Sequence, residues 1–151
     1  MEPGRADALR RLEGELGVLS RRLKCVFDAQ ARVVHPGLQP NAYLVLIWIG
    51  EHGPARPSAI VDEFALDKGA VSRLLTHLDD LGLITRVPDP TDRRATLISA
   101  TAAAVERMTT ATESVRRHRG DRLTDWSDTR LADFVAALTH YNHTLGRTPG
   151  E

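Results

Sequence analysis

The feature that most constrains the fold of this chain is a change of apolar period at Gly82. The apolar residues before it follow the three- and four-residue steps of one helical face: Val71, Leu74, Leu75, Leu78 and Leu81. The residues after it form two short β-branched stretches, 84–87 and 95–99, separated by a proline-rich loop that carries Arg93 and Arg94. Because glycine commonly ends a helix in the left-handed conformation, the sequence predicts a helix followed directly by a β-hairpin.

Two shorter helices are predicted before this unit. The first covers residues 41–51, and a His-Gly-Pro run closes it. Its apolar residues share one predicted side: Leu44, Ile47 and Trp48. Pro57 stands where the first turn of the second helix tolerates proline, and Asp67 is placed to cap the third helix. This order of elements is typical of a winged helix-turn-helix, in which the last helix enters the major groove and the hairpin reaches the minor groove.

Long amphipathic segments flank the predicted winged unit. The N-terminal apolar residues have the seam spacing of a helix that packs against another helix: Leu9, Leu12, Leu16, Leu19, Leu23 and Val26. A His-Pro-Gly run at residues 35–37 ends that helix. Residues 101–119 predict a helix with Val105, Met108 and Val115 as its larger apolar residues, and a last helix begins near residues 127–128.

The apolar stripes of these terminal helices have two interpretations. Each either faces the core of one chain or forms a seam between two chains, and a helix this long near the end of a small chain favours a dimer. The predicted interface consists of leucines from both ends of the chain: Leu9, Leu12, Leu16, Leu19, Leu131, Leu138 and Leu145. One recognition helix buries little surface, whereas two can read successive major-groove faces of one duplex.

Composition excludes several classes of protein. With 151 residues, 42% hydrophobic and 26% charged, the chain fits one ordinary globular domain with helical extensions. The longest apolar run, residues 43–49, is too short to cross a bilayer, and the first residues lack the apolar core of a secretory signal. A lone Cys25 cannot form an internal disulfide, which is typical of a reducing compartment. We therefore expect a cytoplasmic protein without a membrane segment.

The charge balance restricts any nucleic-acid function. The formal net charge of the chain is zero, and residues 56–99 hold six basic and seven acidic side chains. Proteins that bind DNA without sequence preference usually carry a basic excess. DNA binding by this chain therefore requires its acidic groups to point away from the duplex, and predicts a moderate dependence of affinity on salt.

Two stretches resemble a known family. "LDKGAVSRLLTHLDDLGLITRVPDPTDRRATLISAT" resembles the recognition helix and wing of the MarR family of transcriptional regulators, and Asp92 and Arg94 match the Asp-x-Arg of that wing. "LQPNAYLVLIWIGEHGPARPSAIVDEFAL" is similar to the two preceding helices of the family. The resemblance implies a mainly α homodimer with a winged domain over residues 38–100, dimerisation helices over residues 1–37 and 101–147, and usually a repressor whose DNA affinity changes when a small molecule binds.

The resemblance also implies which residues contact a double-stranded, pseudo-palindromic operator. Five positions fall on the outer side of the recognition helix: Lys68, Ser72, Arg73, Thr76 and His77. Arg73 is expected to contact guanine, and Ser72 and Thr76 to bond phosphates or base edges. Arg94 is the expected minor-groove residue, with Asp92 orienting its guanidinium group. Arg86 and Arg93 are expected to touch phosphates.

An effector pocket is also implied by the resemblance, between the dimer helices and the winged domain. The nearby aromatic residues Phe27, Tyr43 and Trp48 are its candidate lining, although ordinary core packing accounts for each of them equally well. A small lipophilic or phenolic compound is the class of effector that we expect.

Other kinds of site find little support in the sequence. Cys25 is interpreted as a small half-buried filler, since it does not align with the cysteine of peroxide-sensing relatives. His140 and His143 lie near one helical face, but no neighbouring ligand completes a metal site. No catalytic constellation or phosphate-binding loop stands out, so we expect neither an enzyme nor a cofactor. The alternative to a regulator is a winged-helix protein-interaction module without specific DNA binding.

Overall fold

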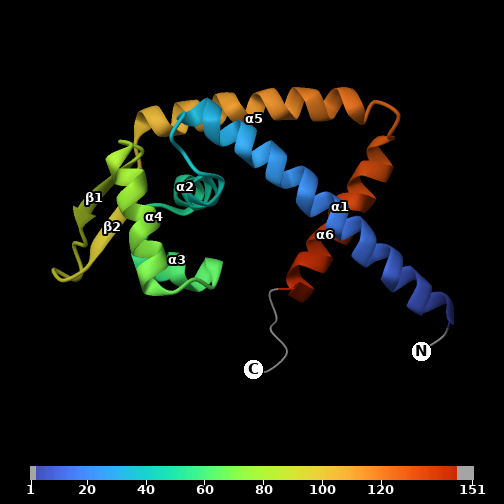
Figure 1. The fold of residues 1–151 in the computed structure, drawn as a ribbon, viewed down its shortest axis with the longest axis horizontal. Coiled ribbons are helices and arrows are strands. Elements are labelled where there is room, and N and C mark those ends of the chain that lie inside the picture. The colour runs from blue at the N-terminus through green and yellow to red at the C-terminus, as the bar shows by residue number, and fades with distance from the viewer. Residues whose placement is uncertain (1–2, 146–151) are drawn as a thin grey trace. The chain divides into compact units, whose positions relative to one another are not determined.

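The computed structural model describes residues 3–145, and these form six helices and one two-stranded hairpin (Figure 1). In chain order the elements are α1 (Pro3–Val34), α2 (Pro40–His52), α3 (Pro57–Phe64), α4 (Lys68–Asp80), β1 (Ile84–Pro88), β2 (Thr96–Ala100), α5 (Ala102–Arg122) and α6 (Asp128–Leu145). The predicted mainly α, winged helix-turn-helix fold is confirmed. Residues 1, 2, 146 and 147 of the predicted dimerisation region lie outside the described residues.

The signals that delimit the recognition helix act as the sequence predicts. Asp67 caps α4, because its Oδ1 accepts a hydrogen bond of 2.7 Å from the backbone N–H of Ala70. Gly82 follows the helix with φ +67°, a left-handed conformation that glycine adopts without strain. Ala65 ends α3 in the same region with φ 48°, where a Cβ atom is unfavourable.

The hairpin receives a third short segment along one edge. β1 and β2 pair antiparallel with Ile84 opposite Ala100 and Arg86 opposite Ile98. On the other side of β2, Ala55 donates its N–H to the Ile98 carbonyl at 3.0 Å and accepts the Ile98 N–H at 2.8 Å. The residues just before α3 are therefore joined to the base of the wing.

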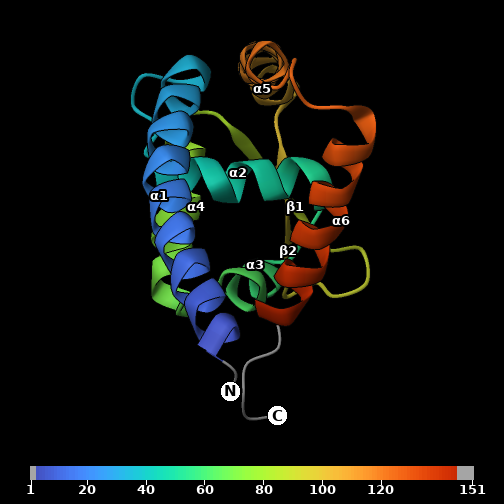
Figure 2. The ribbon, with the colours of Figure 1, turned by 90° about the vertical axis from the view of Figure 1, so that its right-hand side faces the viewer.

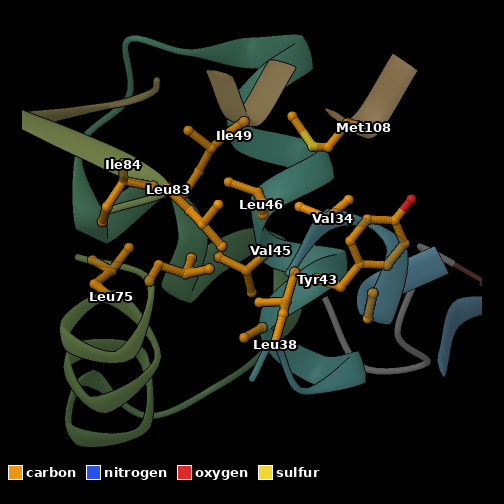
Figure 3. Packing of buried hydrophobic residues seen from close by; sticks show 14 of the residues in the cluster. Val34, Leu38, Tyr43, Val45, Leu46, Ile49, Leu75, Leu83, Ile84 and Met108 are labelled. Atoms are coloured by element: carbon orange, nitrogen blue, oxygen red, sulfur yellow. The ribbon is translucent and has the colours of Figure 1, made fainter. Parts of the chain in front are cut away.

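The core is built around α2, which is covered on several sides. This helix crosses α1 and contacts α4 and β2 (Figure 2). Its buried residues are Ala42, Tyr43, Val45, Leu46 and Ile49, and Figure 3 shows Leu46 and Val45 between residues of α1, α4 and the segment that leads into β1. The predicted side with Leu44, Ile47 and Trp48 is only half-buried. A helix with neighbours on several sides buries more than one stripe of residues. The prediction of a single apolar face was therefore wrong about which residues of α2 are in the core.

The buried side of α5 also differs from the prediction. Ala104, Met108 and Ala111 are buried, whereas Val105 is 44% exposed. The buried side of α5 reaches α2 through a long side chain: a Cβ atom added to Gly50 of α2 would lie 3.0 Å from Cε of Met108. The three buried residues follow steps of four and three and so form one stripe of α5, and Val105 lies beside this stripe.

Thr101 connects three parts of the winged unit. Its backbone N–H donates to the Leu83 carbonyl at 3.0 Å, and its hydroxyl donates to the Gly82 carbonyl at 3.2 Å. The same hydroxyl accepts the N–H of Ala104 at 3.2 Å and so caps α5. The turn after α4, the end of β2 and the start of α5 are thus joined at one residue.

Two helices leave apolar surface uncovered. The described chain divides into two compact units within α5, between Glu113 and Ser114. In the second unit, α6 has no buried residue, and Phe134 and Val135 are 50% and 54% exposed. In the first unit, Leu9, Leu12 and Leu19 of α1 are 40–41% exposed. Across the described residues, every helix is too short or too polar to cross a membrane.

Candidate nucleic-acid interface

The recognition helix α4 has a polar side and an apolar side. Val71, Leu75 and Leu78 are buried against the rest of the winged unit. Four of the five predicted contact residues are exposed on the polar side: Lys68, Ser72, Arg73 and Thr76. Each of these side chains carries a hydrogen-bond donor of the kind that bonds phosphates or base edges.

His77 lies differently from the other four predicted residues. It is half-buried, and its Nε2 atom is covered without a hydrogen-bond partner among the described residues. With Leu74, it lines a cleft of about 620 Å³ whose other wall includes Leu44 and Val45 of α2. Because His77 follows Leu74 by three residues, it shares the side of α4 that faces α2. The exposed polar surface of α4 is therefore narrower than the sequence predicted.

The wing presents its two arginines at the tip. Arg93 and Arg94 are exposed in the loop between β1 and β2. Oδ1 of Asp92 accepts the backbone N–H of Arg94 at 3.0 Å, and the Asp92 carbonyl accepts the N–H of Ala95 at 2.9 Å. Asp92 thus shapes the backbone of the turn, whereas the sequence predicted that it orients the Arg94 guanidinium group.

Arg86, a predicted phosphate contact, has an intramolecular partner. Its Nε lies 2.8 Å from Oδ2 of Asp79 at the end of α4, and both side chains are partly exposed. Arg86 of β1 also lines a small hollow of about 220 Å³ together with Lys68 and Ser72 of α4. The outer side of α4 and the first strand of the wing are therefore neighbours, as Figure 1 also shows.

The sequence interpretation missed one ion pair that reaches the wing. Nε of Arg56, just before α3, donates to Oδ2 of Asp89 at 2.7 Å. Oδ1 of Asp89 accepts the hydroxyl of Thr91 at 2.7 Å and its N–H at 2.8 Å. The hydrogen bonds from Thr91, with a further contribution from Arg56, lower the pKa of Asp89 to about 2. The Asp-x-Thr spacing signals this local turn in the sequence, but no signal indicates the Arg56 partner.

These contacts account for the unfavourable charge balance of the winged unit. Among its acidic residues, Asp67 caps a helix, Asp79 pairs with Arg86, and Asp89 pairs with Arg56. Asp92 accepts the N–H of Arg94, so four of the seven acidic groups are engaged within the protein. The ion pairs also neutralise two of the six basic groups, which leaves the exposed cations of α4 and of the wing tip to face a partner.

The three candidate effector residues do not line one cleft. Phe27 lines a cleft of about 680 Å³ between α1 and α2, together with Leu23, Lys24 and Leu44. Tyr43 is fully buried, its hydroxyl has no hydrogen-bond partner of standard geometry among the described residues, and burial raises its pKa. Trp48 stacks on His52 with ring centroids 4.8 Å apart. Core packing therefore accounts for Tyr43, whereas Phe27 borders open space.

The remaining sequence candidates are on the surface. Cys25 is exposed, so its interpretation as a half-buried filler is wrong for the described chain. Its neighbours Leu23 and Phe27 on α1 are half-buried and line the cleft toward α2. His140 and His143 are exposed on α6, and no cluster of three metal-ligating side chains occurs within residues 3–145.

Comparison with known proteins agrees with this geometry. Residues 37–95 match the sequence profile of the MarR family. The chain is 30% identical over 132 residues to YxaD of Bacillus subtilis (strain 168), an uncharacterized HTH-type transcriptional regulator, and the match covers 87% of this chain and 90% of YxaD. The chain belongs to the MarR family.

Two further proteins are similar to this chain over most of its length. A proposed transcriptional regulatory protein for the hcr operon of Thauera aromatica is 26% identical over 141 residues, covering 91% of this chain and 85% of that protein. Among solved structures, FabT of Streptococcus pneumoniae in complex with DNA has a TM-score of 0.77 and 18% identity, covering 91% of this chain and 96% of FabT. At that identity the structural match shows the shared fold.

Proposed function

We propose that this chain is a homodimeric, sequence-specific DNA-binding transcriptional regulator, and that it is a repressor that responds to a small molecule. The observation that carries the proposal is the exposed polar side of α4 next to a wing whose tip displays two arginines. The membership of the MarR family and the DNA complex of the similarly folded FabT support it.

Each exposed residue of this surface has a proposed role. Arg73 makes a bidentate contact to guanine in the major groove, which discriminates against other bases by about 1–3 kcal/mol. Ser72, Thr76 and Lys68 bond phosphates or base edges around it. Arg94 enters the minor groove, and Arg93 contacts the adjacent phosphate.

Three further predicted residues contribute less directly to the proposed interface. Asp92 holds the backbone of Arg94 in the turn. Arg86 faces a phosphate while it stays in its ion pair with Asp79, so it adds no free charge to the interface. His77 lies at the edge of the surface, half-covered by α2.

Selection from a random duplex pool tests DNA recognition. The expected product is a pseudo-palindrome with half-sites one helical turn apart, because each subunit of a dimer presents one recognition helix. Arg73→Ala and Arg94→Ala are expected to weaken binding to the selected duplex, whereas Arg117→Ala on α5 serves as the matched control. Failure to enrich any sequence, with partner proteins still bound, would support the protein-interaction module instead.

We propose that the uncovered faces of α1 and α6 form the dimer interface, within dimerisation segments 1–37 and 101–147. The exposed leucines and the absence of a buried residue in α6 support this, because a helix without a covered face gains little from packing within its own chain. Leu16→Glu and Leu138→Glu are expected to give monomers in sedimentation velocity. Ala136→Glu, on the opposite side of α6, should leave the dimer intact.

We also propose that a lipophilic or phenolic effector binds the cleft that Phe27 lines between α1 and α2. The supporting observations are its volume, about 680 Å³, and a lining that combines Phe27, Leu23 and Leu44 with the amine of Lys24. A panel of small phenols is expected to release the selected duplex from the wild-type protein but not from Phe27→Ala. Equal release from both proteins would place the effector elsewhere.

A further inference from the structure

We propose that Asp89 and Arg56 are positioning residues for the wing: their ion pair holds the wing loop against the start of α3, so that Arg94 is presented to DNA in one geometry. This inference rests on the proposed DNA-binding function. Neither residue is itself assigned a DNA contact.

The carboxylate of Asp89 is held by donors from two directions. Oδ2 accepts Nε of Arg56 at 2.7 Å and lies 2.5 Å from its Nη2, while Oδ1 accepts the N–H and hydroxyl of Thr91. Although Asp89 lies in a surface loop, it is only 5% exposed to solvent. A carboxylate that is this well covered, and that accepts hydrogen bonds from each of these neighbours, is held in one position. A solvated ion pair on the surface is not held in this way.

The pair acts together with a second connection one residue away. Ala55 is hydrogen-bonded in both directions to Ile98 in the middle of β2, and Arg56 extends from the next position toward the loop. The N–H of Asp89 donates to the Ala95 carbonyl at 3.0 Å and closes the loop behind the arginines. The middle of β2 and the start of the wing loop are thus both attached to residues 55–56, immediately before α3.

Charge alone and positioning predict opposite effects of the same substitution. Asp89→Asn removes a negative charge and leaves Arg56 unpaired, so a purely electrostatic contribution predicts tighter binding to DNA. If the pair positions the wing, the same substitution loosens the loop, and ordering it on the duplex then opposes binding. A weaker complex after the loss of an acidic group is therefore the signature of positioning.

The test compares Asp89→Asn with Asp80→Asn, an exposed acid at the end of α4 that removes the same charge without touching the wing. Fluorescence anisotropy with the duplex selected by the wild-type protein is expected to show about a tenfold weaker complex for Asp89→Asn. Asp80→Asn is expected to bind as tightly as the wild type or more tightly. Arg56→Gln should reproduce the loss, and the double variant should lose no more than either single one.

Combination with Arg94→Ala separates a positioning role from a general loss of structure. If Asp89 acts through the wing arginine, Asp89→Asn costs little further affinity in the Arg94→Ala background. Additive losses, or an Asp89→Asn variant that binds like Asp80→Asn, would overturn the proposal. Thermal unfolding of each variant confirms that the fold is retained.

Limited trypsin digestion tests the positioning of the loop without DNA. Trypsin cleaves after Arg93 and Arg94, and its rate depends on how often the loop opens. Cleavage there is expected to be several-fold faster in Asp89→Asn than in the wild type, and equal cleavage rates would refute the attachment of the loop. A wild-type protein that binds no duplex, with this difference in cleavage still present, would instead refute the proposed DNA-binding function.

Discussion

The salt dependence of DNA binding follows from which arginines are already paired in the protein. Arg86 is neutralised by Asp79 at 2.8 Å, whereas Arg93 is exposed at the wing tip. Each phosphate that a protein neutralises adds about 0.9 to the slope of log affinity against log salt. Arg93→Gln removes one such contact per subunit, so the slope of a dimer is expected to fall by about 1.8.

A double variant serves as the control, because it removes an ion pair instead of an unpaired charge. In the double variant Arg86→Gln, Asp79→Asn, one positive and one negative charge disappear together, and the slope is expected to stay within error of the wild type. The difference is measurable: between 200 and 50 mM salt, the affinity lost by Arg93→Gln relative to the wild type should grow about 12-fold, which is the fourfold change in salt raised to that difference in slope.

Fluorescence anisotropy titrations of the selected duplex, at four salt concentrations over this range, give both slopes. A slope for Arg93→Gln equal to that of the wild type would show that the wing tip does not approach a phosphate. A fall of about 1.8 for the double variant would show that Arg86 leaves Asp79 when DNA binds.

Three predictions concern the stability of the protein. Leu46→Ala is expected to lower the free energy of unfolding by about 2–5 kcal/mol in urea titrations, because Leu46 is fully buried in the core; a smaller loss would mean that the core collapses around the cavity. Ala65→Gly should raise it by about 0.5–1 kcal/mol, since glycine relieves the left-handed φ of 48°, and a loss would contradict that strain. Because the pKa of Asp89 is lowered to about 2, its ionised carboxylate stabilises the folded protein above pH 4, and this stabilisation is lost as the pH falls toward 2. Acid unfolding of Asp89→Asn should lack this part of the pH dependence.

Local signals made most of the fold predictable from the sequence. The cap at Asp67, the turn at Gly82 and the change of period after it each act over a few residues, and the structure confirms all three. The face of α2 was not predictable in this way, because burial on several sides leaves no single stripe. Likewise, Val105 of α5 is exposed because two of the three residues on the buried stripe, Ala104 and Ala111, are alanines, which give only a weak apolar signal in the sequence.

The site was predictable where it depends on helical spacing and not where it depends on distant contacts. The exposure of Ser72 and Arg73 follows from their place on α4. The pair of Arg56 and Asp89 joins positions 33 residues apart, next to the hydrogen bonds between Ala55 and β2. Periodicity carries no information on such a contact, nor on the choice of Asp79 as the partner of Arg86.

Thr101 makes the start of α5 move together with the winged unit. Because its hydrogen bonds connect the start of α5 with the carbonyls of Gly82 and Leu83, a tilt of that helix carries the end of α4 and the hairpin with it as one body. In a dimer, the separation of the two recognition helices would then change when the start of α5 tilts. A ligand could then release an operator without changing the DNA-contacting surface itself. It need only change that separation, so that the two recognition helices no longer fit half-sites one helical turn apart.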